Sequence, residues 1–297
     1  MNHIKDQIRC GAAYRLGLTG KGIGVAVLDT GIFLHRDFDS RVTGFADMVN
    51  GKNFAYDDCG HGTHICGIIG GSGRMSGGRY SGIAPGCDLV MVKVLDRKGN
   101  GYSSDVLAGI SWILERKEKL GIRVLNISVG ACSKRGMSEN SALVKGVNRA
   151  WDAGLVVVVA AGNNGPRTMS ITTPGISRKV ITVGCSDDDR EVLVGGNRMV
   201  DYSGRGPTAA CICKPDLVAP GCSVVSCSSR ADKYTIKSGT SMSTPIVSGA
   251  VALLLERFPD MSNKDVKLRL RESSVDIGLP RNQQGWGLLD VGKMLER

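Results

Sequence analysis

The residues of this chain best suited to chemistry are Asp29, His61, Asn163 and Ser241. A serine hydroxyl is a weak nucleophile near neutral pH. It becomes reactive when a base takes its proton, an acid orients that base, and hydrogen-bond donors stabilise the negative charge on the substrate oxygen. Imidazole, carboxylate and carboxamide groups suit these three tasks. The four residues therefore predict nucleophilic catalysis by Ser241, provided that the fold brings them together.

Each of these residues, taken alone, has a simpler interpretation. Asp29 and Asn163 follow apolar runs and are typical of turns, and Ser241 opens an apolar run, where it would serve as a helix cap. His61 and His64 have the i, i+3 spacing of a metal pair, but the HExxH pattern is absent. We therefore expect no metal at His61 and a buried hydrogen-bonding role for His64.

The four residues are far apart in the chain, so they depend on a fold that gathers the ends of strands. Apolar, β-branched runs predict buried strands over 22–28, 88–94, 122–127 and 155–160. Helical spacing predicts helices over 65–69, 103–117 and 138–152, and an apolar helix follows Ser241. Alternating strands and helices form a mostly parallel, twisted sheet with helices on both faces. We therefore expect a three-layer, doubly wound α/β fold whose strand ends share one edge.

The remaining segments complete a single predicted domain over 1–297. Residues 1–20 are expected to form an irregular or partly helical arm, with no propeptide before it. Short strands are predicted over 180–183 and 223–226, and helices near 263–272 and 290–296. No linker, low-complexity block or fixed-period repeat divides the chain.

Composition and charge indicate which class of partner the protein could bind and whether it could span a membrane. The formal charge is +10, but Lys and Arg are scattered, and the densest cluster, 116–119, also contains an acid. We therefore expect a solvated basic surface and no nucleic-acid partner. The chain has no apolar run of 18 residues, so no membrane span is predicted. The oligomeric state is left open by the sequence.

Ten cysteines raise the question of disulfides or zinc. The polar start of the chain lacks a secretory apolar region, and several cysteines lie inside apolar segments. Cys211 and Cys213 lack both the CxxC spacing and a second ligand pair of a zinc site. We expect reduced thiols and a cytoplasmic protein.

Four motifs in one order carry a family resemblance. The chain resembles the subtilisin-like serine proteases (subtilases, peptidase family S8), in which Asp, His, Asn and Ser motifs follow in this order. Segments 93–96 and 202–208 look most like the bacterial intracellular alkaline proteases. The four motifs are Asp29-Thr30-Gly31, His61-Gly62-Thr63-His64, Ala161-Gly162-Asn163 and Gly239-Thr240-Ser241-Met242-Ser243-Thr244-Pro245.

The resemblance implies a role for each residue. Ser241 attacks the peptide carbonyl, His61 transfers the proton, and Asp29 orients the imidazole. The Asn163 amide and the Ser241 backbone N–H form the oxyanion hole. The residues implied to bind substrate are Ser128, Val129 and Gly130, which would pair with an extended peptide, and Ala160, Ala161 and Gly162, which would form the wall of a roomy apolar pocket. Large hydrophobic residues are expected at P1, the residue before the cleaved bond.

The sequence also departs from the family. Residues 70–79 stand where the family usually has its calcium loop, and they contain two arginines and no carboxylate. We therefore expect no strong calcium site and no required cofactor, and a weaker calcium site elsewhere is left open. Cys59 lies two residues before His61, and Cys66 follows on the predicted helix. The simpler interpretation is that both are inert small residues. The alternative hypothesis is that a thiol near the imidazole is reactive and that bulky thiol reagents inhibit by crowding the cleft.

Three functions from different classes follow. The first is a serine endopeptidase of broad specificity that acts on protein or peptide substrates through an acyl-enzyme. The second is a catalytically silent scaffold of the same fold that binds or regulates a partner. The third, a basic nucleic-acid-binding protein, has no supporting motif.

Overall fold

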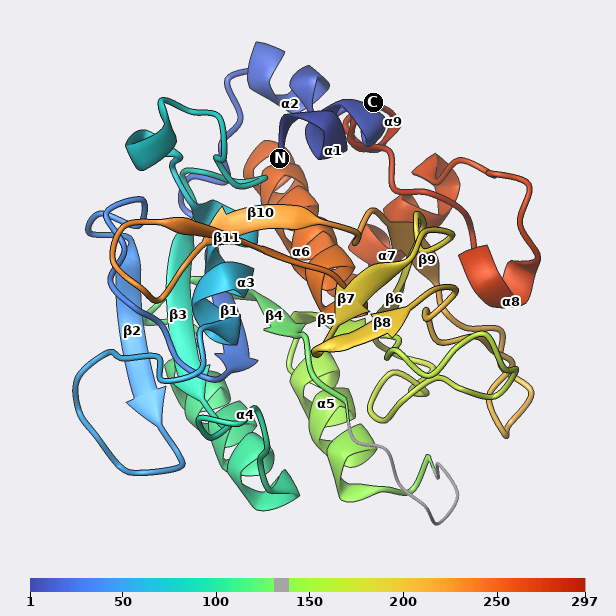
Figure 1. Ribbon diagram of the computed structural model, residues 1–297, viewed down its shortest axis with the longest axis horizontal. Helices are drawn as coiled ribbons and strands as arrows, with labels where there is room; N and C mark the ends of the chain where they lie inside the picture. The colour runs from blue at the N-terminus through green and yellow to red at the C-terminus, as the bar shows by residue number, and fades with distance from the viewer. Residues whose placement is uncertain (131–138, 297) are drawn as a thin grey trace.

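A parallel sheet forms the centre of the protein in the computed structural model, which describes residues 1–130 and 139–296 (Figure 1). The sheet has seven strands in the order β2-β3-β1-β4-β5-β6-β9, and every neighbouring pair is parallel. Its strands are β1 (Gly24–Asp29), β2 (Val42–Asp47), β3 (Asp88–Lys93), β4 (Ile122–Ile127), β5 (Val156–Ala160), β6 (Ile181–Cys185) and β9 (Leu217–Ala219). The predicted α/β class is confirmed.

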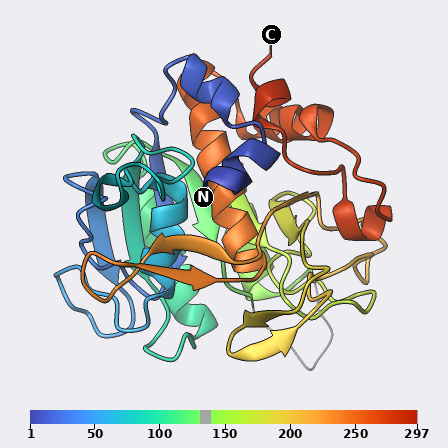
Figure 2. The ribbon, with the colours of Figure 1, turned by 45° about the horizontal axis from the view of Figure 1, so that its top comes forward.

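Helices pack on both faces of this sheet and make the three layers that were expected. Helices α3 (His61–Gly70) and α6 (Thr240–Arg257) contact each other and the central strands. Figure 2 shows α6 crossing the molecule beside α3. Helices α4 (Ser103–Arg116) and α5 (Ala142–Asp152) contact each other and pack against β1 and β5. Except at Ser241, α6 is buried on every side up to Leu255, and apolar residues therefore occur all around it.

The two ends of the chain lie side by side (Figure 1). Arg9 makes an ion pair with Asp290, and the N–H of Val291 donates to the carbonyl of Ile8. The expected arm at 1–20 therefore contains two short helices and packs on the last helix. The elements of this region are α1 (Asn2–Gln7), α2 (Gly11–Arg15), α7 (Asn263–Ser273), α8 (Arg281–Gln284) and α9 (Val291–Met294).

Two antiparallel ribbons stand outside the sheet. One pairs β10 (Val224–Cys227) with β11 (Tyr234–Lys237), and the other pairs β7 (Val192–Val194) with β8 (Asn197–Met199). A short 3-10 helix, η1 (Arg74–Ser76), completes the described elements. The sequence had indicated only β10 among these ribbon strands. It had also missed β2 and β9, and its helix over 138–152 begins at Ala142.

Two predicted properties are visible in the described part of the chain. The nine cysteines there are all free, and Cys132 lies outside the described residues. None of the helices in residues 1–130 or 139–296 combines the length and the apolar character needed to cross a membrane.

Candidate active site

Asp29 and His61 form an acid–imidazole pair at the carboxyl edge of the sheet. Asp29 ends the buried strand β1, and His61 begins α3. The Nδ1 atom of His61 lies 2.8 Å and 2.9 Å from the two carboxylate oxygens of Asp29. A carboxylate accepts only, so Nδ1 carries a proton and Nε2 is the free basic nitrogen. Burial lowers the pKa of His61, but the charge and hydrogen bond of Asp29 together outweigh burial and raise that pKa above its ordinary value.

Close backbone packing sets the distance between these two side chains. A Cβ at Gly62 would collide with the carbonyl oxygen of Gly31, and Gly31 has the positive φ of +123° that favours glycine. The N–H of Gly62 donates to Thr30 Oγ1 at 2.9 Å. The glycine in each motif therefore lets α3 approach the end of β1.

Asp57 is a positioning residue that the sequence analysis missed. Its carboxylate accepts hydrogen bonds from Thr30 Oγ1 (2.9 Å), the Gly60 N–H (2.7 Å), and both the N–H and Oγ1 of Thr63 (2.9 and 2.6 Å). These bonds join the end of β1 to the first turn of α3, whose free N–H groups favour a negative charge. Four donors of this kind hold His61 in register with Asp29.

Lys93 stabilises the segments next to Asp29 and His61 from inside the protein. Its side chain is fully buried, and Nζ donates to Thr30 O (2.6 Å), Leu95 O (2.7 Å) and Asp58 Oδ1 (2.8 Å). A buried ammonium is costly unless its three donors are satisfied, as they are here. Lys93 therefore links the segments that contain Thr30, Asp58 and Leu95.

Ser241 is the half-exposed residue in an otherwise buried helix start. Residues on either side of it in α6, from Thr240 to Leu255, are buried. Its Oγ donates to the backbone carbonyl of Ser128 at 2.7 Å. The hydroxyl has one proton, so general-base transfer to His61 requires that this proton leave the Ser128 carbonyl. Ser241 thus contacts the predicted substrate-binding segment directly.

The carboxamide of Asn163 is oriented by Thr240. Asn163 Oδ1 accepts from the Thr240 N–H (2.9 Å) and from Thr240 Oγ1 (3.0 Å). The backbone N–H can only donate, so the atom facing it must be the oxygen, and Nδ2 takes the other position. Because Asn163 lines the same cleft as Ser241, an oriented Nδ2 donor is available in that cleft.

One cleft, with a volume of about 460 Å³, contains most of the predicted site. The predicted residues that line it are His61, Ser128, Val129, Gly130, Ala160, Gly162, Asn163 and Ser241. Asp29 lies behind His61 and is fully buried. Ala161 is also fully buried, and its carbonyl accepts the Thr172 N–H at 2.9 Å, so it supports the wall from behind.

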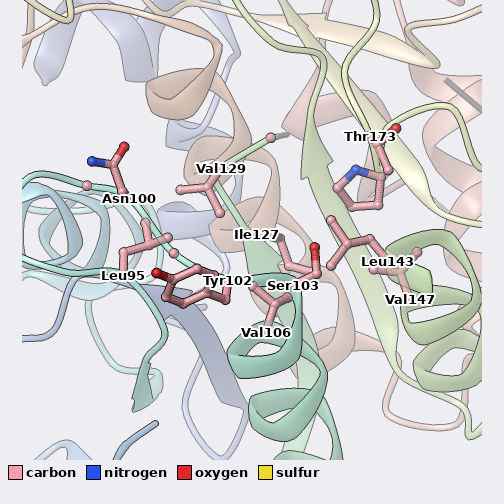
Figure 3. A pocket seen from close by; sticks show the side chains of 14 residues that line it. Leu95, Asn100, Tyr102, Ser103, Val106, Ile127, Val129, Leu143, Val147 and Thr173 are labelled. Carbon is pink, nitrogen blue, oxygen red and sulfur yellow. The ribbon is translucent and has the colours of Figure 1, made fainter. Parts of the chain in front are cut away.

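A second, apolar pocket continues from this cleft and was not predicted. Leu95, Gly99, Val129 and Gly130 line both cavities. Figure 3 shows Tyr102 and the aliphatic side chains converging on it from several elements. Its apolar walls are formed by Leu95, Tyr102, Val106, Ile127, Val129, Leu143 and Val147, around a volume of about 210 Å³. Such a pocket suits a large hydrophobic side chain of an extended ligand.

The rings of His35 and His64 are held by hydrogen bonds to the backbone. His64 is fully buried, its Nε2 lies 3.1 Å from Val224 O and 3.2 Å from Thr235 O, and burial lowers its pKa to about 3. This is the buried hydrogen-bonding role that was predicted. His35 Nδ1 accepts the Asp37 N–H at 3.1 Å, and Nε2 lies 3.1 Å from Lys233 O. Both rings are therefore held by backbone groups.

The carboxylate of Asp37, which faces the loop 70–79, is surrounded by donors. It accepts from the Met75 N–H (2.9 Å) and from the Tyr234 hydroxyl (2.7 Å). Arg74 from the same loop pairs with Asp39 at 3.2 Å. A calcium ion needs several oxygens that point inward and are not already bonded to N–H or O–H groups. The residues at this position do not fit calcium.

Comparison with known proteins agrees with this geometry. The profile of the subtilase family (Peptidase_S8) matches residues 20–287. Serine protease AprX of Bacillus subtilis (strain 168) is 41% identical over 290 residues, which cover 92% of this chain and 65% of that protein. Subtilisin Savinase of Lederbergia lenta is 34% identical over 286 residues, covering 96% of this chain and 95% of that protein.

Solved structures give the same result. Sphericase superposes with a TM-score of 0.77 at 31% identity, covering 92% of this chain and 93% of that chain. A cold adapted subtilisin-like serine proteinase has a TM-score of 0.75 at 29% identity, covering 92% and 90%. Family profile, relatives and fold coincide, and the chain belongs to the subtilase family of serine peptidases.

Proposed function

We propose that this chain is a serine endopeptidase that uses Ser241 as nucleophile, His61 as general base and acid, and Asp29 as the orienting carboxylate. The observation that carries the proposal is the hydrogen bond of His61 Nδ1 to both Asp29 oxygens, at 2.8 and 2.9 Å, in the cleft that contains Ser241. That bond fixes the tautomer in which Nε2 can accept a proton.

In the proposed reaction the Ser241 proton moves to His61 Nε2 as Oγ attacks the peptide carbonyl. The carbonyl oxygen becomes negatively charged and is stabilised by Asn163 Nδ2 and by the Ser241 N–H at the start of α6. His61 then gives the proton to the leaving amine, which leaves an acyl-enzyme on Ser241. Water then attacks the acyl-enzyme while His61 Nε2 accepts its proton. His61 returns that proton to Ser241 Oγ as the ester bond breaks and the carboxylic acid leaves.

The substrate is an extended segment of protein or peptide. Its backbone would pair with Ser128, Val129 and Gly130 as an added strand. We propose that its P1 side chain, large and hydrophobic, lies beside Ala160 and Gly162. The pocket around Tyr102 and Val129 would accept a second large apolar side chain of the same peptide.

No metal enters this mechanism. The donors around Asp37 and the arginine-containing loop 70–79 support a proposal that activity requires no added calcium. Activity that stays constant in excess chelator is the expected result.

A peptide-library cleavage profile tests the proposal. We expect internal cleavage after large hydrophobic residues in the wild type and none in Ser241→Ala. Tyr102→Ala should raise KM several-fold only for peptides whose second apolar side chain reaches that pocket. A folded wild type that cleaves nothing would favour the silent scaffold, and a strong preference for charged P1 residues would contradict the apolar pocket.

A further inference from the structure

Two cysteines and an aspartate meet behind the active-site wall and take no part in the proposed reaction. Cys185 ends β6, Asp187 follows two residues later, and Cys222 lies in the loop after β9. Strands β6 and β9 are paired with Cys185 beside Ala219, which brings the three residues together. Their sulfur and carboxylate oxygen atoms all lie within 4.8 Å of one another.

The separation of these atoms suits a tetrahedral metal ion. Zinc bonds of about 2.3 Å to sulfur and about 2.0–2.2 Å to oxygen place ligand atoms about 3.5–3.8 Å apart. Cys185 Sγ lies 3.1 Å from Asp187 Oδ1, and the Tyr202 hydroxyl lies 3.2 Å from Cys185 Sγ and 3.1 Å from Cys222 Sγ. The three ligand atoms are therefore close enough for small side-chain shifts to bring them around one ion.

The surroundings orient the ligands as an outer shell of a metal site does. Asp187 Oδ1 accepts from the Gly221 N–H (2.7 Å) and the Cys222 N–H (3.1 Å), which fixes the direction of the carboxylate. The Tyr202 hydroxyl is fully buried and is placed to donate to a thiolate. Cys185 is also fully buried, and Cys222 is only 8% exposed, so the two sulfur ligands lie in a dry environment beside a partly buried Asp187.

We propose that Cys185, Asp187 and Cys222 bind a thiophilic divalent cation, with zinc as the fitting ion and water or the Tyr202 hydroxyl as fourth ligand. Binding forms two metal–thiolate bonds and one metal–carboxylate bond, and it releases the two thiol protons to solvent. Affinity therefore falls as the pH is lowered. This proposal is independent of the proteolytic mechanism.

Asp187 favours a cation over a disulfide between the two cysteines. A disulfide would remove the S–H that now faces the carboxylate at 3.1 Å and would leave that negative charge beside two sulfurs. A cation uses all three groups at once. The cluster of His35, Asp37 and Cys227 offers no equivalent site. The one lone pair of His35 Nδ1 accepts the Asp37 N–H, and Nε2 then carries the proton that faces Lys233 O, whereas a carboxylate that accepts N–H groups keeps further lone pairs.

An occupied site would stiffen the wall behind the nucleophile. The carbonyl of Gly221, next to Cys222, accepts the Gly239 N–H at 3.0 Å, and Gly239 precedes Thr240 and Ser241. The metal would hold the 219–222 loop against β6, and that loop holds Gly239. We expect bound zinc to raise the midpoint of thermal unfolding.

Cobalt binding to the full chain, carrying Ser241→Ala to prevent self-digestion, tests the site. After reduction and removal of bound metal, one equivalent of Co²⁺ should give the thiolate charge-transfer absorption of a tetrahedral complex. Cys185→Ser or Cys222→Ala should abolish that band, and Asp187→Asn should weaken binding at least about tenfold. The matched control, Cys211→Ser with Cys213→Ser, alters two exposed cysteines and should leave the band unchanged.

Three results would overturn the proposal. They are a band that survives Cys185→Ser and Cys222→Ala, a band lost in the Cys211 and Cys213 control, and a reduced protein that binds neither Co²⁺ nor Zn²⁺. A disulfide between Cys185 and Cys222 in the unreduced protein, found together with that last result, would identify the pair as a redox couple. Circular dichroism on each variant separates loss of the site from loss of the fold, and Asp187→Asn keeps both thiols if a cysteine variant fails to fold.

Discussion

Ser241 Oγ donates its single proton to the backbone carbonyl of Ser128 at 2.7 Å, so the proposed nucleophile is hydrogen-bonded to the segment that is proposed to bind substrate. A peptide N–H that pairs with this carbonyl would compete with the hydroxyl for the same acceptor. Substrate binding would then release the Ser241 proton to His61. In this arrangement, pairing of the substrate with the Ser128 carbonyl would be coupled to activation of the Ser241 hydroxyl.

Removing the competing N–H from the substrate tests this coupling. A peptide N-methylated at the P1 nitrogen cannot donate to Ser128, and the loss of one hydrogen bond should lower kcat/KM by about 2–12-fold. The loss should include kcat, because the Ser241 proton stays on the Ser128 carbonyl. A control peptide methylated far from the cleaved bond should react normally, and an effect on KM alone would argue against the coupling.

Asn163 has two roles that substitutions can separate. Asn163→Ala removes both the donor to the oxyanion and the acceptor for Thr240, so kcat should fall by roughly 10²–10³-fold, with some loss of stability. Asn163→Asp keeps an oxygen for the Thr240 N–H but places negative charge beside the oxyanion. It should lower kcat at least as much while preserving the unfolding midpoint better. Near-normal kcat in both variants would exclude Asn163 from the oxyanion hole.

The pH profile should follow His61. Burial lowers the pKa of His61, the Asp29 carboxylate raises it by more, and the positive charge of Lys237 opposes Asp29. The net pKa is raised, and only neutral His61 can act as base, so kcat/KM should fall as the pH drops through a value above about 6.5. Lys237→Gln should move this midpoint further upward.

The dependence on salt concentration is the control for the effect of Lys237 on the pKa of His61. Lys237 lines the open cleft, so its effect on His61 should shrink as ionic strength rises. The difference between wild type and Lys237→Gln should therefore narrow in high salt. A midpoint that moves downward in Lys237→Gln would contradict the assignment.

Cys59 is the thiol that bulky reagents should reach. It is exposed and lines the catalytic cleft, whereas Cys66 is fully buried. Burial raises the pKa of the Cys59 thiol despite its partly open position, so alkylation should be slow near neutral pH and faster as the pH rises. A bulky maleimide should inhibit the wild type and spare Cys59→Ser. Unchanged activity after complete alkylation would exclude crowding at this residue.

The sequence predicted the elements whose pattern is local and strong. Strands β1, β3, β4 and β5 are buried on both faces and read as continuous apolar runs. Strand β2 is only partly buried and contains Gly44, so its run of apolar residues is broken. Strand β11, Tyr234–Lys237, is only partly buried and forms by pairing with β10. A strand that forms by pairing with another segment shows no comparable apolar run in the sequence.

The site divides in the same way. Motif order indicated Asp29, His61, Asn163 and Ser241, because each residue type has a recognisable chemical task. The role of Asp57 depends on hydrogen bonds to Thr30 and to the first turn of α3, which only the folded chain assembles. The bond from Ser241 to Ser128 depends on a side-chain rotation that no sequence pattern encodes. The sequence could indicate candidate residues for the site, but it could not indicate the contacts that support them.

The most direct test of the central claim is covalent labelling of the full chain with a fluorophosphonate, read by mass spectrometry of the labelled peptide. We expect one equivalent of label, located on Ser241, with none in Ser241→Ala. Labelling should be slowed by orders of magnitude in Asp29→Asn, because the His61 tautomer is no longer fixed. A well-folded wild type that takes up no label, or that carries it on another residue, would contradict the account.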